Sequence, residues 1–130
     1  MKKFVLVALT GALVLSALPV LAHHSASMFE PTKTVTITGV VKQFQYTNPH
    51  SWLIVEVMGP KGTVASTWGF EAEGPGTLLR SGIRKSDLEP GTRVTVTGHP
   101  MRDGRTAATW IKAVLPSGKV LVPMPPKATF

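Results

Sequence analysis

Apolar and polar residues alternate along much of this chain with the two-residue period of β-strands. The pattern predicts five strands, at residues 34–46, 52–58, 63–71, 93–98 and 105–115, followed by a short hairpin to residues 120–122. In the first strand the apolar positions change from odd to even numbers at Gly39, which predicts a β-bulge there. Residues 52–58 are apolar in both phases, so we expect that strand to be covered on both sides.

Turn and helix signals separate these strands. Residues 47–50, Thr-Asn-Pro-His, predict a turn, because proline cannot donate a hydrogen bond to a strand ladder. Residues 59–62 and Asp103-Gly104 predict further turns, the latter a hairpin signal. Residues 77–82 combine an N-cap candidate, helix formers and a terminal glycine, which predicts a short helix.

This order of elements predicts a mainly β fold: a five-stranded Greek-key barrel of the oligonucleotide- and oligosaccharide-binding (OB) type, with one short helix between strands three and four. The barrel is expected at residues 34–122, with an N-terminal arm at 23–33 and a flexible tail at 123–130. A seven-stranded sandwich is the alternative, but it requires more strands than the pattern offers and no helix.

The start of the chain has the pattern of an export signal. Lys2 and Lys3 precede an apolar run at 4–20, and Val20-Leu21-Ala22 places small residues at the cleavage positions. The run is shorter than the roughly 20 residues of a membrane-spanning helix. We therefore expect cleavage after Ala22, a periplasmic protein, and no stable membrane anchor after cleavage.

Charge and cysteine content narrow the classes of partner. After cleavage the chain has twelve basic and seven acidic residues, a net charge of +5 with neutral histidines. These basic residues are scattered without a run of five, so we expect no nucleic-acid partner. The chain has no cysteine, which excludes disulfides and thiolate metal ligands.

Several motifs together resemble one family. They are His23-His24-Ser directly after the signal, Gly39-Val-Val, Asn48-Pro49-His50, a tryptophan in the third strand, and Pro90-Gly91-Thr-Arg-Val-Thr-Val-Thr-Gly98. The combination resembles a family of small exported bacterial proteins of unknown function and spans nearly all of the mature chain. The resemblance implies export and an OB-like barrel, and it implies no activity.

The new amino terminus is the feature with the most distinctive chemistry. An N-terminal histidine offers its α-amine and a ring nitrogen to one metal ion, and His24 adds a second imidazole. With nitrogen donors and no thiolate, Cu(II) is the first-row divalent ion that such a site holds most tightly. The predicted metal ligands are His23, His24 and His50, with copper as the possible cofactor.

These histidines also have a simpler interpretation. Two histidines at a chain end are often only solvated, and a histidine in an Asn-Pro-His turn can bond a neighbouring backbone group. The linear order does not bring His50 near residue 23. His99, before Pro100, is the histidine with the weakest case for binding a metal.

The aromatic residues give an alternative function. Trp52, Trp68 and Trp110 fall on predicted strands, and OB-type barrels bind ligands on the face of strands two and three. The alternative is therefore an interaction module for an envelope protein or a glycan. Trp68 and Phe70 are expected to pack in the core instead.

Enzyme signatures are sparse. The sequence contains no Gly-x-Ser-x-Gly elbow and no phosphate-binding glycine loop. Glu71 and Glu73 are candidates for a pair of glycosidase acids, but their spacing places them on one side of a strand, where they are better interpreted as an acidic rim. We expect a non-enzymatic β-barrel that binds a small ligand or metal ion, with the interaction module as the alternative.

Overall fold

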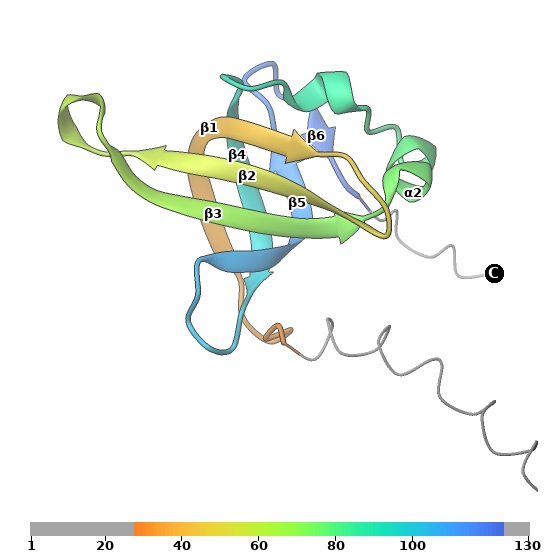
Figure 1. The fold of residues 1–130 in the computed structure, drawn as a ribbon, viewed down its shortest axis with the longest axis horizontal. Coiled ribbons are helices and arrows are strands. Elements are labelled where there is room, and N and C mark those ends of the chain that lie inside the picture. Colours follow the sequence, from red (N-terminus) through yellow and green to blue (C-terminus); the bar gives the residue numbers. More distant parts are fainter. Residues whose placement is uncertain (1–27, 124–130) are drawn as a thin grey trace, which may run out of the picture.

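The computed structural model describes residues 28–123 and consists mainly of strands. The strands are β1 (Val35–Gln45), β2 (His50–Met58), β3 (Val64–Glu73), β4 (Arg93–Pro100), β5 (Ala107–Val114) and β6 (Val120–Leu121). A short helix, α2 (Pro75–Arg80), and two 3₁₀ turns, η1 (Pro60–Gly62) and η2 (Lys85–Leu88), complete the described elements (Figure 1). Within this part of the chain, no helix is long and apolar enough to cross a membrane.

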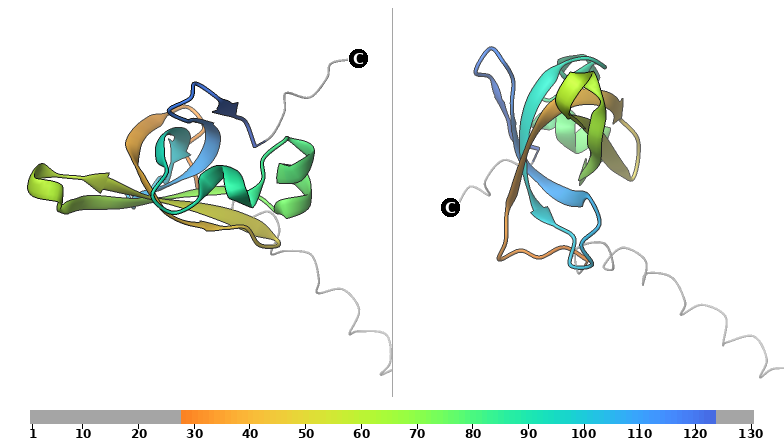
Figure 2. Two further views of the ribbon diagram at one scale, coloured as in Figure 1. Left: turned by 90° about the horizontal axis from the view of Figure 1, so that it is seen from above. Right: turned by 90° about the vertical axis from the view of Figure 1, so that its left-hand side faces the viewer.

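The strands form one closed barrel. Their hydrogen-bonded order is β3-β2-β1-β4-β5-β6, and parallel pairing between β3 and β5 closes the sheet on itself. Figure 2 shows β1 curving strongly as it passes from one side of the barrel to the other. This closure of five strands, with α2 inserted between β3 and β4, confirms the predicted OB-like architecture.

Strand β1 bends because it has two partners. Residues 35–40 pair with β4, and residues 40–45 pair with β2. The predicted bulge at Gly39 is wrong in position, since the register shift lies between Val41 and Gln43. Gly39 has a different role: a Cβ there would overlap the carbonyl oxygen of Glu56, so glycine lets β2 approach the bend closely.

The core lies inside the barrel and is made by alternate residues of every long strand. Leu53, Val55 and Phe70 are completely buried, and Trp110 is 5% exposed. Leu78 of α2 and Leu88 of η2 close one end of the same cluster. The barrel therefore has a continuous apolar interior, and its chemistry is carried by the outer face and the loops.

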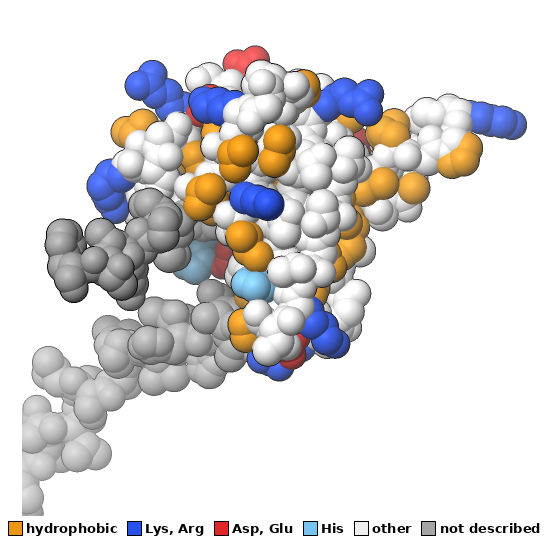
Figure 3. Space-filling model, turned by 180° about the vertical axis from the view of Figure 1, so that it is seen from behind, with side chains coloured by type: hydrophobic (Ala, Val, Ile, Leu, Met, Phe, Trp, Pro, Cys, Tyr) orange, Lys and Arg blue, Asp and Glu red, His pale blue; other side chains and the backbone are white. Residues whose placement is uncertain are grey.

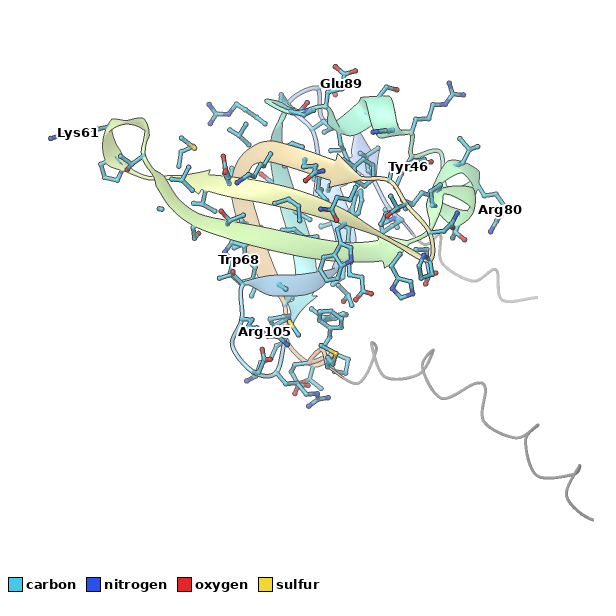
Figure 4. All side chains as sticks on the ribbon, viewed as in Figure 1. Tyr46, Lys61, Trp68, Arg80, Glu89 and Arg105 are labelled. Carbon is cyan, nitrogen blue, oxygen red and sulfur yellow. The ribbon has the colours of Figure 1, made fainter. Side chains whose placement is uncertain are left out.

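Segments between the strands mostly follow their predicted types. The helix begins at Pro75 and ends at Arg80, two residues earlier than the predicted range, and η2 lies between the helix and β4. Tyr46, the residue directly after β1, donates a shared hydrogen bond to the carbonyl oxygens of Pro75 and Ile83, at 3.2 and 3.0 Å. This contact fixes α2 beside the β1–β2 loop (Figure 4).

The hairpin of β2 and β3 extends beyond the barrel, with Lys61 at its tip (Figure 4). Close to the barrel its register is regular, with His50 opposite Glu73 and Trp52 opposite Glu71. Its inner residues are buried, whereas Trp52 and Ile54 on the outer side are only partly buried. Strand β2 is therefore covered on both sides, but less completely on the outer side.

Candidate functional site

The predicted site residues fall in different parts of the chain. His23 and His24, with the signal sequence, lie outside the described residues 28–123. His50 was expected in a turn, but it is the first residue of β2. The strand begins there because the next residue, Ser51, turns inward, is fully buried and pairs with Ala72. His50 is thereby held on the outer face of the sheet.

His50 contacts a carboxylate across the hairpin. Its Nδ1 atom is hydrogen-bonded to Oε1 of Glu71 on β3. The residue directly opposite His50 is Glu73. Glu71, two residues earlier on β3, lies on the same outer face at a diagonal position. The Glu71 side chain is 11% exposed and that of His50 is 37% exposed. The carboxylate is thus largely shielded while the imidazole remains open to solvent on one side.

His99, near the end of β4, has a similar arrangement with a different acceptor. Its Nδ1 atom lies 2.7 Å from the carbonyl oxygen of Lys33 in the N-terminal arm. A carbonyl oxygen only accepts, so the ring nitrogen must carry the proton in this hydrogen bond. The contact joins β4 to the arm that precedes β1.

Both described histidines therefore donate a proton from Nδ1. An ionised carboxylate, like a carbonyl, only accepts, so Nδ1 of His50 is the protonated nitrogen as well. In a neutral ring this leaves the lone pair on Nε2. Histidines that bind metals in proteins are usually held in this way, with the second ring nitrogen donating to a carboxylate or carbonyl.

The two histidines lie near the seam that closes the barrel. His99 is opposite Thr109 of β5, Thr109 is the parallel partner of Glu71, and Glu71 is opposite Trp52. One row across four strands thus connects His99 with the carboxylate that holds His50. Figure 3 shows both histidine side chains on the same face of the molecule, one of them beside an acidic group.

The described residues do not form a complete metal site. No group of three or more histidine, aspartate or glutamate side chains within residues 28–123 is arranged to hold a metal ion. A hollow of about 550 Å³ is lined by residues of β1 and the η2 region, including Phe44, Lys85 and Glu89, and none of the histidines. A metal bound at His50 therefore requires ligands from elsewhere.

The N-terminal arm is attached to the barrel beside the β4–β5 turn. Phe29 pairs with Met101, and the strand positions from Met101 through Ala107 to Gly69 lead across the barrel to β3. Gly69 is opposite Ile54, so His50 lies one strand further across and four positions further along β2.

The aromatic residues do not form a continuous platform. Trp110 points into the barrel and is 5% exposed, and Trp68 stacks on buried Phe70 with ring centroids 6.3 Å apart. Trp52 lies on the outer face, where its ring packs over Gly69: a Cβ at that glycine would be 3.3 Å from the indole. Of the three tryptophans, only Trp52 stands on the outer face of β2 and β3.

The contact between His50 and Glu71 was missed in the sequence, although a signal was present. A hairpin pairs residues that are symmetric about its turn, and the turn at residues 59–62 places His50 beside the Glu71–Glu73 segment. By themselves, the positions of Glu71 and Glu73 in the sequence indicate only an acidic rim. The link between His99 and the Lys33 carbonyl had no signal, because it depends on the path of the arm.

Comparison with known proteins gives a family but no activity. No curated protein and no solved structure matches the chain significantly. The model of a family of unknown function, DUF6152, matches residues 12–112, which is most of the sequence. The chain belongs to the DUF6152 family.

Proposed function

We propose that this protein is an exported, non-enzymatic metal-binding protein that captures Cu(II) between its mature N-terminus and the outer face of the β2–β3 hairpin. The ligands in this proposal are the α-amine and ring of His23, the ring of His24, and Nε2 of His50. The observation that carries it is the hydrogen bond from Nδ1 of His50 to Glu71, which orients the ring and leaves Nε2 as a donor.

Three features support a shared site. His50 is exposed enough to meet an incoming ligand, and Glu71 is buried enough to hold it rigidly. Residues 28–123 contain no group of three side chains that could hold a metal ion, and the N-terminal histidines would supply the ligands that His50 needs beside it. Nitrogen donors without thiolates favour Cu(II) over other first-row divalent ions.

The identity of the terminus is decisive for this proposal, because the α-amine is a ligand only if cleavage follows Ala22. Edman sequencing of protein recovered from the periplasm of an expressing bacterium is expected to begin His-His-Ser. A different first residue would remove the α-amine from the ligand set. Retention of the protein in the cytoplasm would contradict export.

Copper titration tests the ligand set. The untagged mature chain beginning at His23 is compared with the same chain carrying one additional alanine before His23. We expect the added residue to weaken Cu(II) binding at least tenfold, because it displaces the amine from the chelate with the His23 ring. Equal affinities would exclude the terminal site, and absence of binding by both chains would favour the interaction module on the face that carries Trp52.

A further inference from the structure

One end of the barrel is formed by α2, η2 and β6, which come from two separate stretches of the sequence (Figure 1). Two side-chain hydrogen bonds hold these stretches together. Nζ of Lys119 lies 2.8 Å from Oδ1 of Asp87, and the Ser81 hydroxyl donates to the carbonyl oxygen of Pro123 at 3.0 Å. Residues 119–123 therefore run alongside residues 81–87.

Large hydrophobic side chains are exposed at this end. Leu121 is 2% exposed and points into the barrel, so its neighbours Val120 and Val122 point outward, and they are 53% and 38% exposed. In α2, Leu78 is completely buried, whereas the next residue, Leu79, is 56% exposed, more than any other large hydrophobic residue in the described part of the chain. These three outward side chains lie outside the core and cover nothing within the described residues.

Basic side chains share the same two stretches. They are Arg80, Arg84 and Lys85 on exposed positions of the α2–η2 segment, and Lys119 before β6. Figure 4 shows Arg80 on the outer side of α2. Lys119 is paired with Asp87, but no salt bridge in the described part of the chain involves the other three. We call the hydrophobic residues Leu79, Val120 and Val122 together with these four basic residues the basic cap.

The fold creates this surface, because the basic residues are scattered in the sequence. Acidic residues balance only part of its charge: the α2–η2 segment and the turn after it contain Asp87, already paired, and Glu89. Exposed hydrophobic side chains among unpaired cations suit an anionic bilayer in two ways. The hydrophobic side chains can enter the boundary between headgroups and acyl chains, and the cations are attracted to the lipid phosphates. The core of a protein interface, in contrast, is depleted of lysine.

We propose that the basic cap docks this protein reversibly on a membrane surface that contains anionic phospholipids. Leu79, Val120 and Val122 enter the interface, and the three unpaired basic residues face the lipid phosphates. An exported chain meets such lipids on the membranes that bound the periplasm. The docking requires no metal ion, so it is independent of the proposed copper site.

The test is binding of the untagged mature chain to phosphatidylglycerol-containing vesicles and to pure phosphatidylcholine vesicles, measured by co-sedimentation. One variant combines Arg84→Gln with Lys85→Gln. Its matched control combines Lys33→Gln with Lys61→Gln, which removes the same charge from exposed positions outside the cap.

A second pair of variants tests the hydrophobic contribution. Leu79→Ser is compared with Val64→Ser, since Val64 is 49% exposed but lies on β3, outside the cap. Thermal unfolding verifies that each variant is folded.

We expect binding to the anionic vesicles only, and weaker binding at high salt, because salt screens exposed charges. Each basic residue near an anionic surface strengthens binding about fivefold, so the cap double variant should bind at least tenfold more weakly. Leu79→Ser should bind about threefold more weakly, because less apolar surface is buried.

The controls decide whether the cap is the docking surface. Losses of less than twofold are expected for Val64→Ser and smaller losses for the Lys33 and Lys61 control than for the cap variant. Equal losses in the two charge variants would overturn the proposal, because binding would then follow net charge alone. Equal binding to both kinds of vesicle would also overturn it. Absence of binding to anionic vesicles at low salt would exclude the membrane and leave an acidic protein as the partner for this surface.

Discussion

The inner and outer faces of strand β2 have similar hydrophobicity in the sequence but different environments in the structure. On the inner face Ser51, Leu53 and Val55 are completely buried. On the outer face Trp52 and Ile54 are only partly buried, and Trp52 lies over the backbone at Gly69. Apolar residues in both phases of a strand therefore indicate cover on both sides without equal burial, and the outer side keeps room for the contact between His50 and Glu71.

The largest expected difference between the two faces is in stability. Leu53→Ala should lower the free energy of unfolding by about 3 kcal/mol, because it removes a fully buried side chain and leaves a cavity. Ile54→Ala, one residue away on the outer face, should cost less than half as much. Urea unfolding measures both; equal losses would show that the outer face contributes as much packing as the core.

A pair of glycine substitutions sharpens the same comparison. At Gly98 a Cβ would overlap the carbonyl oxygen of Thr109, which belongs to the backbone of the adjacent strand, so Gly98→Ala should cost about 2 kcal/mol. At Gly69 a Cβ would meet side chains instead, the ring of Trp52 at 3.3 Å and Cδ1 of Ile54 at 3.7 Å, and these side chains can shift. Gly69→Ala should therefore change stability little and alter tryptophan fluorescence, as measured by urea unfolding and emission spectra.

The outer face should matter more for binding than for stability. Glu71→Gln keeps an acceptor for His50 but removes the negative charge, and it should weaken Cu(II) binding by about tenfold, as expected for the partner of a metal-bound histidine. Glu73→Gln removes the same charge from the residue directly opposite His50 and serves as the control. Competition titration of both variants measures the difference; equal effects would reduce Glu71 to a source of general negative charge.

The smallest effect is expected at a polar contact far from the histidines. Asp87 accepts hydrogen bonds from the amide of Arg84 and from Nζ of Lys119, at 2.7 and 2.8 Å. Burial opposes its ionisation, but these hydrogen bonds and the nearby positive charges outweigh burial and lower the pKa of the carboxyl. Asp87→Ala should cost about 1 kcal/mol at neutral pH.

The sign of the pH dependence follows from the lowered pKa. The stability that Asp87 contributes is complete above the pKa of the unfolded chain and is lost as the pH falls through the lower pKa of the folded state, so the loss begins below about pH 4. Urea unfolding of wild type and Asp87→Ala between neutral pH and pH 3 should therefore converge toward the acid end. A difference that stays constant over this range would assign the effect to packing.

The sequence was sufficient for features that depend on local pattern. Alternation in residues 34–38 and 93–98 predicted β1 and β4, and the turn residues placed the helix between strands three and four, which together indicated the OB-like barrel. The bulge was predicted at the wrong position, because glycine is needed at residue 39 for the close approach of the Glu56 carbonyl from another strand. Local pattern carries no information about such contacts.

The candidate site was only partly predictable for the same reason. The sequence identified His50 but assigned it to a turn, since it could not show that Ser51 faces the interior. The partner of His50, Glu71, required the register of the hairpin, and the acceptor of His99 required the path of the N-terminal arm. The ligand roles of His23 and His24 stay a prediction, because these residues lie outside the described part of the chain.

The measurement that tests the central claim most directly is the Cu(II) affinity of the untagged mature chain with His50→Gln and, separately, with His99→Gln. Both substitutions remove one imidazole from the same face, and glutamine at 99 can still donate to the Lys33 carbonyl. We predict at least tenfold weaker binding for His50→Gln and less than a twofold change for His99→Gln. Equal affinity of the His50→Gln variant and the unsubstituted chain would contradict a site shared between the terminus and the barrel.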